Sequence, residues 1–129
     1  MSRRYEDWLA QGERDLAAAE ESVRAGFYEW AAFQAQQGAE KALKALLRYH
    51  HHEARGHTLV HLLEIVQSLL PVPSEAWVWA RELDRHYIQP RYPNGFAAGY
   101  PAEFYDRDTA QRAVEYGKAI LQFVRENLA

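Results

Sequence analysis

The sequence predicts an all-α protein, an up-and-down bundle of five helices. Apolar residues recur every three or four positions over most of the 129 residues, the spacing at which one face of a helix is buried. Prolines and glycines divide this pattern into five segments, and none alternates apolar and polar residues as a strand does. With 48% hydrophobic residues the chain is long enough for one core, so we expect a single domain over residues 1–129.

The first two predicted helices are the longest. An apolar stripe predicts a helix from about residue 3 to residue 24, which the following Gly26 ends. A second stripe predicts a helix from about Tyr28 to Tyr49. Small residues form a narrow face on this helix: Ala31, Ala35, Gly38, Ala39 and Ala42. Because such a face lets a neighbouring helix approach closely, we expect the second helix at the centre of the bundle.

Two shorter helices follow. Leucines and valines spaced over Leu59–Leu70 predict a third helix, which is halted by the prolines that come after it. Ser74 is a typical N-cap for a fourth helix, and Pro90 ends that helix. With these boundaries, the fourth helix contains both Arg81 and His86.

A long loop separates the fourth helix from the last. The segment from Gln89 to Tyr105 holds several prolines and glycines, and it is longer than an ordinary connection in a helical bundle. Loops of this length are typically functional or disordered. After the loop, Asp108 followed by Gln111 resembles a capping box and predicts the start of the fifth helix.

Composition excludes several classes of protein. The chain has no cysteine, which excludes a disulfide framework, a thiol nucleophile and a cysteine-ligated metal. It has no run of about 18 uncharged apolar residues and no apolar segment of signal-peptide type near its start. We therefore expect a soluble cytoplasmic protein with no membrane partner. No glycine-rich phosphate loop, serine triad or carboxylate pair supports a kinase, hydrolase or glycosidase.

Charge is distributed unevenly along the chain. The net charge of −3 argues against nonspecific binding of nucleic acid. Within residues 41–61, however, four basic residues accompany a single acidic one, a local charge of +3 that leaves −6 for the rest. Five of the six histidines lie in the same window. This asymmetry permits a local anion site, although a solvated helix face gives the same pattern.

Motifs along nearly the whole chain resemble the HEPN domain family. They are Trp8 with Leu16, the run FQAQQGAEKALKALL from Phe33 to Leu47, GHTL from Gly56 to Leu59, LDRHYI from Leu83 to Ile88, and RYPN from Arg91 to Asn94. The resemblance implies a helical bundle, dimers packed around the long helices, and a link to nucleotides, RNA or a partner nucleotidyltransferase. It leaves activity open, because some members are metal-independent ribonucleases and others bind or assist without cleaving.

Arg81 and His86 match the R-x(4–6)-H motif of the ribonuclease members and are the candidate catalytic residues. Cleaving RNA without a metal needs a base for the 2′-hydroxyl proton and a cation for the charge that grows on phosphorus. Histidine and arginine fit these roles. On an ideal helix, however, side chains five residues apart diverge by roughly 140°, so the two groups converge only on a distorted helix or across two subunits.

Two further observations weaken this motif. Arg55 and His61 match the same pattern elsewhere in the chain. Some toxin members also carry a tyrosine two positions after the histidine, whereas here Tyr87 follows the histidine directly. The alternative interpretation is a partly exposed helix end with a surface ion pair to Glu82 or Asp84.

The segment Arg91-Tyr92-Pro93-Asn94 is the stronger candidate for a constrained site. Pro93 favours an extended backbone at Tyr92, and Asn94 followed by glycine favours a tight turn. An arginine beside an aromatic ring can hold a phosphate and stack a base; the alternative is a loop that only packs against the bundle. The candidate nucleotide- or phosphate-binding residues are Arg85, Arg91, Tyr92, Asn94, Lys41 and Lys44.

The histidines raise the question of a metal site. His57, His61 and Glu64 lie at positions i, i+4 and i+7, a spacing that can place three ligands on one helix face. The family resemblance, however, gives His57 a structural role at a helix start, and the triplet at residues 50–52 rarely has ligand geometry. We therefore expect no metal and no cofactor.

Two functions remain. The first is a nucleotide- or RNA-binding helical module, with a nucleotidyltransferase as its protein partner in a toxin–antitoxin type pair. The second is a metal-independent endoribonuclease that uses Arg81 and His86. In either case we expect a homodimer, for two reasons. The narrow face of the second helix allows close packing, and an aromatic content of 13% is more than one thin bundle easily buries.

Overall fold

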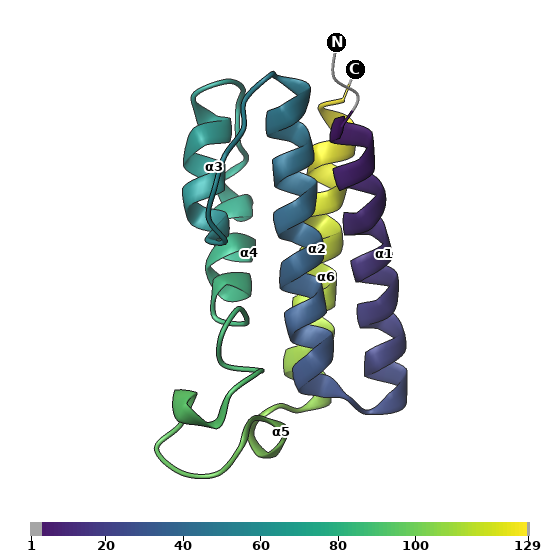
Figure 1. Ribbon diagram of the computed structural model, residues 1–129, viewed down its shortest axis with the longest axis vertical. Helices are drawn as coiled ribbons and strands as arrows, with labels where there is room; N and C mark the ends of the chain where they lie inside the picture. The colour runs from purple at the N-terminus through teal and green to yellow at the C-terminus, as the bar shows by residue number, and fades with distance from the viewer. Residues whose placement is uncertain (1–3, 129) are drawn as a thin grey trace.

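The computed structural model describes residues 4–128, and within that range its regular secondary structure is helical, with no strand. Its elements are α1 (Arg4–Ala25), α2 (Tyr28–Tyr49), α3 (Leu59–Gln67), α4 (Ser74–Asp84), a short 3₁₀ turn (Pro93–Gly95), α5 (Pro101–Phe104) and α6 (Arg107–Glu126). The long helices α1, α2 and α6 lie side by side, and α3 and α4 lie along the other side of α2 (Figure 1). The predicted all-α bundle is confirmed, and α5 is a single extra turn within the long loop.

The narrow face of α2 is used for packing within the chain. A Cβ atom on Gly38 would lie 2.9 Å from the carbonyl oxygen of Gly12 on α1 and 2.7 Å from Cγ of Leu16. A Cβ on Gly117 of α6 would lie 2.6 Å from Cδ2 of the same leucine. Such distances are too short for a real side chain, so the glycines allow α1, α2 and α6 to approach closely. The predicted central position of α2 is confirmed, but the narrow face gives no argument for a dimer.

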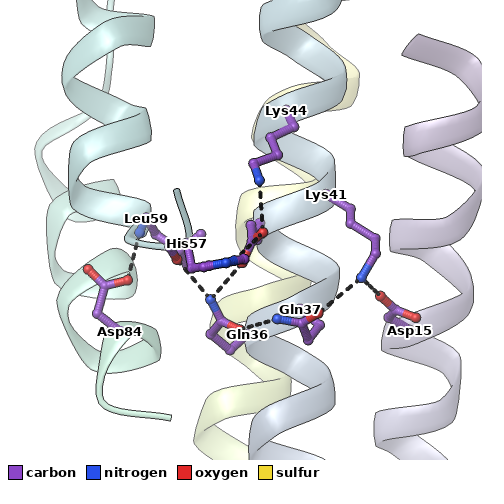
Figure 2. Close-up of polar contacts among 9 residues, drawn as sticks. Asp15, Gln36, Gln37, Lys41, Lys44, His57, Leu59 and Asp84 are labelled. Atoms are coloured by element: carbon purple, nitrogen blue, oxygen red, sulfur yellow. Dashed lines mark hydrogen bonds and ion pairs between the residues drawn. The ribbon is translucent and has the colours of Figure 1, made fainter. Parts of the chain in front are cut away.

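The segment between α2 and α3 returns along the bundle. Residues 50–58 descend beside α2, so that α3 rises in the same direction as α2 and α4 then descends (Figure 1). As a consequence, the start of α3 lies beside the end of α4 (Figure 2). The loop of residues 85–106 continues from that end and carries α5.

Several predicted helix boundaries are wrong. The helix α4 ends at Asp84 and therefore contains Arg81 but not His86. The chain tightens directly after this helix. The backbone N–H of His86 donates to the carbonyl of Leu83, three residues earlier, whereas an α-helix would use the carbonyl four residues earlier. The N-cap of α4 is Pro73, whose fixed φ of −66° suits that position, and Ser74 is the first helical residue.

Other helix ends also differ from expectation. The helix α6 is capped by Asp106, whose carboxylate accepts a hydrogen bond from the backbone N–H of Thr109 at 2.8 Å, and not by Asp108. The third helix ends at Gln67 rather than residue 70. The expected start of the first helix, at residue 3, lies outside the described residues. None of the described helices combines the length and the apolar character needed to cross a lipid bilayer.

Candidate functional site

A buried carboxylate on α2 organises the polar contacts at the centre of the molecule (Figure 2). Glu40 is 5% exposed and accepts hydrogen bonds from Lys44 Nζ at 3.0 Å, from His57 Nδ1 at 3.0 Å and from Gln36 Nε2 at 3.2 Å. Because a buried charge is costly without partners, these three donors stabilise the ionised carboxylate. The three residues of α2 lie at helical spacing, so all of them face the segment that leads into α3.

His57 connects this buried group to the surface. Its Nδ1 nitrogen must donate to Glu40, because a carboxylate only accepts, and its backbone carbonyl accepts from Gln36 at 3.0 Å. The imidazole stacks on Tyr87 with ring centres 4.5 Å apart, while 52% of the side chain stays exposed. The structure records no partner for Nε2 among the described residues. The ring is therefore fixed on one edge and free on the other.

Asp84 fixes the start of α3 beside this histidine. Its carboxylate accepts from the backbone N–H groups of Leu59 at 2.6 Å and Val60 at 3.2 Å, where Thr58 provides no side-chain cap. Burial raises the pKa of Asp84, and the two backbone hydrogen bonds oppose that rise. A carboxylate at the first turn of a helix also complements its dipole. Asp84 therefore caps α3 from the neighbouring helix α4 and does not form the surface ion pair that the sequence suggested.

An open pocket of about 290 Å³ lies between the ends of α3 and α4. Its lining includes His57, Thr58, Asp84, Arg85, Tyr87 and Gln89. Small-molecule sites have volumes from about 300 Å³ upward, so this pocket has room for a phosphate group or part of a nucleotide rather than a large cofactor. The lining combines one guanidinium, one imidazole and two hydroxyls, groups that bind oxyanions, with the carboxylate of Asp84.

Arg91 lies next to the pocket in an unusual environment. Its guanidinium carbon is 4.4 Å from the ring centre of Phe33, 4.7 Å from that of Tyr87 and 5.2 Å from that of Tyr92. Its Nε donates to the backbone carbonyl of Tyr87 at 2.8 Å, which fixes the plane of the group. The residue is half-buried and pairs with no carboxylate in the described part of the chain. Its outer N–H groups remain available to an anion.

Comparison with known proteins identifies the fold family at this point. The family model of the HEPN domain matches residues 5–127. The chain belongs to the HEPN domain family. A search of curated protein sequences gave no significant match.

Three solved structures superpose on the chain over nearly its full length. A protein from Thermus thermophilus is 39% identical with a TM-score of 0.96, over 98% of this chain and 100% of that one. An archaeal HEPN homologue is 37% identical with a TM-score of 0.84, over 100% of this chain and 100% of that one. A HEPN domain protein from Thermotoga maritima is 32% identical with a TM-score of 0.78, over 95% of this chain and 97% of that one.

The candidate phosphate-binding residues of this HEPN domain fall into two groups. Arg85, Arg91 and Tyr92 lie in or beside the pocket, and Asn94 lies in the exposed 3₁₀ turn that follows. The two lysines are already paired. Lys41 donates to Asp15 on α1 at 2.7 Å, and the ammonium group of Lys44 is buried against Glu40. The site proposed below therefore does not use either lysine.

The other predicted site, Arg81 with His86, is not assembled within one chain. His86 is only 4% exposed, so the expectation of a partly exposed side chain is wrong. Its Nε2 lies 3.0 Å from Glu82 Oε2 and its Nδ1 lies 2.8 Å from the hydroxyl of Tyr105. Arg81 is exposed, and no hydrogen bond or ion pair joins it to the imidazole. The ribonuclease hypothesis stays a prediction.

Electrostatics around His86 indicate a structural group. Burial lowers the pKa of His86, and the hydrogen bond to Glu82 opposes that shift. Partial burial disfavours the charge on Glu82, but its contacts with His86, Arg112 and Arg85 together lower the pKa of this carboxyl. The neutral ring donates from Nε2 to Glu82 and accepts at Nδ1 from Tyr105. The cluster ties the loop before α6 to the end of α4.

The possible metal ligands do not converge. Among residues 4–128, no three histidine or acidic side chains lie close enough together to hold a metal ion. His57 turns inward to Glu40, whereas His61 lies outside with Nδ1 3.8 Å from an exposed Glu64. A spacing of i, i+4 and i+7 does not form a site here because His57 precedes the helix and has a different backbone direction.

Sequence reasoning missed the contact between Glu40 and His57. Both residues lie in the motifs that carry the family resemblance, but their separation of 17 positions crosses the end of a helix and follows no helical period. Phe33 was missed as a partner of Arg91 for the same reason. A buried glutamate within an otherwise apolar helix face was the one available signal, because such a group needs a partner from elsewhere in the fold.

Proposed function

We propose that this HEPN domain protein is a binding module for the phosphate groups of a nucleotide or RNA, with Arg91 as the main contact. The observation that carries the proposal is the guanidinium group held over three aromatic rings with no carboxylate partner. A fixed arginine loses little side-chain entropy when it binds, and its planar donors match phosphate oxygens. An arginine that served only packing would more commonly be paired with an acid.

The neighbouring residues suit the rest of such a ligand. Tyr92 is 48% exposed and is available to stack on a base. Arg85 lines the pocket with 69% of its side chain exposed, so it can bind a second phosphate oxygen at a modest cost in lost contacts with Glu82. Asn94 lies in the turn that follows Tyr92 and offers an amide to a sugar or a base.

Binding to nucleotides is tested by fluorescence polarisation with labelled ATP and with a short labelled RNA. Arg91→Ala should weaken binding by about tenfold or more, the loss expected for a charge-assisted contact. Arg91→Lys should recover part of the affinity, because it keeps the charge but not the planar donors. Arg81→Ala is the matched control and should bind as the wild type does. Equal affinity in Arg91→Ala and wild type would contradict the proposal.

A homodimer and a nucleotidyltransferase partner complete the proposal. Large apolar side chains are exposed at the end of the bundle that holds the α1–α2 turn and α5: Phe27, Trp30, Tyr92, Tyr100 and Phe104. A small protein seldom leaves so many aromatic residues in water without a partner, which supports a protein contact at this end. Light scattering at micromolar concentration should give a dimer, and a strict monomer in that experiment would contradict this part.

A further inference from the structure

His57 has the environment of a nucleophile rather than that of a purely structural histidine. One edge of its ring is bound to buried Glu40, and the other edge carries Nε2 with no partner in the described residues. Half of the side chain is exposed, and it lines the pocket between α3 and α4. A ring held only for packing has no need of a free nitrogen beside an open pocket.

Lys44 forms an ion pair with the carboxylate that holds this ring. The ammonium lies 3.0 Å from the carboxylate, so the charge of Lys44 balances the charge of Glu40 without any charge on the imidazole. Glu40 therefore fixes the tautomer with the proton on Nδ1 and leaves the lone pair on Nε2. This is the arrangement by which a carboxylate orients an imidazole for attack on an electrophile.

We propose that His57 is a phosphorylation site, modified on Nε2 by a phosphoryl donor of the acyl phosphate class. In this step the Nε2 lone pair forms a bond to phosphorus, and the bond between phosphorus and the acyl oxygen breaks. The carboxylate product leaves with that electron pair. The ring gains positive charge while its proton stays on Nδ1, where the hydrogen bond to Glu40 stabilises it.

The pocket supplies groups for the transferred phosphoryl oxygens. Arg85 contributes a guanidinium and Thr58 a hydroxyl to the same lining. The Tyr87 ring stacks on the imidazole and fixes its plane, so that Nε2 keeps one direction. The proposal shares Arg85 and the pocket with the proposed nucleotide site, but its test measures a covalent product on His57 and not the affinity of Arg91.

The other histidines of the chain provide an internal comparison. His61 lies one turn further along and is similarly exposed, at 59%, but its acidic neighbour Glu64 is itself 63% exposed and 3.8 Å away. His86 is buried, with both nitrogens engaged. Exposure alone would therefore predict similar reactivity for His61 and His57. The hydrogen bond that orients the His57 ring distinguishes the two.

The test uses acetyl phosphate, a small acyl phosphate, on the full chain at about pH 8, where phosphohistidine is stable. Tandem mass spectrometry of digests taken over time gives the rate at each histidine. We expect His57 to react at least about tenfold faster than His61, in line with the usual effect of an orienting carboxylate. The ³¹P NMR spectrum should show a single N-linked phosphorus signal at early times.

Variants separate orientation from exposure. Glu40→Gln should slow labelling of His57 by about tenfold while labelling of His61 keeps its wild-type rate, and circular dichroism checks that the variant is folded. His57→Gln should remove the early product. Equal rates at His57 and His61 in the wild type would overturn the proposal without any variant, and so would labelling of His57 that does not respond to Glu40→Gln in a folded protein.

Discussion

His57 and His86 make similar contacts in different surroundings. Each imidazole donates to a glutamate, Glu40 in one case and Glu82 in the other. His86 is 4% exposed and uses its second nitrogen to hold Tyr105, whereas the His57 ring is half exposed and its second nitrogen is free. The histidine that matches a catalytic motif is thus enclosed, and the one that the family resemblance makes structural is chemically accessible.

The difference shows which property separates a structural histidine from a reactive one. Both have a carboxylate partner, so a carboxylate alone does not decide the role. What differs is whether the second nitrogen has a hydrogen-bond partner among the described residues. Substitutions at these sites and a change of pH test this distinction, mainly through stability, from the largest expected effect to the smallest.

Removing the carboxylate should cost more at the His57 site than at the His86 site. Glu40→Ala leaves the ammonium of Lys44 buried without a partner, and we expect the free energy of unfolding to fall by about 3 kcal/mol. Glu82→Ala leaves the Nε2 donor of His86 without its acceptor and two arginines that are partly exposed, but no unpaired buried charge, so its loss should be smaller, about 1–2 kcal/mol. Urea unfolding followed by circular dichroism measures both. A larger loss in Glu82→Ala would show that Lys44 is not dependent on Glu40.

Removing the imidazole should reverse that order. His86→Ala creates a cavity in the core and leaves the Tyr105 hydroxyl without its acceptor, at a cost of about 2 kcal/mol. His57→Ala removes a half-exposed ring, and about 1 kcal/mol is expected. The same urea titration compares the two variants. If His57→Ala were the more damaging, the structural interpretation of His86 would be wrong.

Much of the fold could be predicted because helical periodicity is a local signal. The span of α2 was predicted to the residue, from Tyr28 to Tyr49, and the glycine-lined contact of α1 with α2 followed from its small residues. The end of α4 could not be predicted in this way. Pro90 marks the last place where a helix can continue, but the chain leaves the helix earlier because His86 turns inward to Tyr105.

The candidate site was only partly predictable, because it depends on contacts between distant segments. Arg91 and Tyr92 were identified from a short motif whose proline restricts the backbone. The aromatic surroundings of that arginine include Phe33 from α2, and the partner of His57 is Glu40 from the same helix. Neither distance in sequence follows a helical or strand period. The return of residues 50–58 along α2 brings His57 to Glu40, and the descent of α4 brings Arg91 to Phe33 (Figure 1).

Acid should weaken the fold through His86. Burial lowers its pKa, so on acidification the unfolded chain binds a proton at a higher pH than the folded chain does. Its contribution to stability is complete above the ordinary histidine pKa of about 6.5 and is lost as the pH falls through the lower pKa of the folded state. The free energy of unfolding should therefore fall between about pH 7 and pH 5, and less steeply in His86→Gln. Urea titrations at several pH values measure this slope.

Two neighbouring carboxyl groups extend the pH dependence to lower values. The pKa of Glu82 is lowered, so its contribution to stability is also lost as the pH falls, but further into the acid range. The raised pKa of Asp84 acts in the opposite direction, since protonation of the folded state relieves the cost of a buried charge. A slope between about pH 7 and pH 5 that is identical in wild type and His86→Gln would show that the buried imidazole does not titrate as described.

The smallest effect is expected from Arg81, and it bears directly on the ribonuclease hypothesis. Arg81 is exposed and makes no contact with His86, so Arg81→Ala should change the free energy of unfolding by no more than about 0.5 kcal/mol. A stable variant of this kind permits a clean activity test with varied RNAs in the presence of a chelator. Because His86 is enclosed by Glu82 and Tyr105 within one chain, we expect the wild type to cleave none of them. Chelator-resistant cleavage that is lost in both Arg81→Ala and His86→Ala would show instead that the two side chains are brought together, by a second subunit or by opening of the loop, and the distinction between the enclosed and the accessible histidine would then fail.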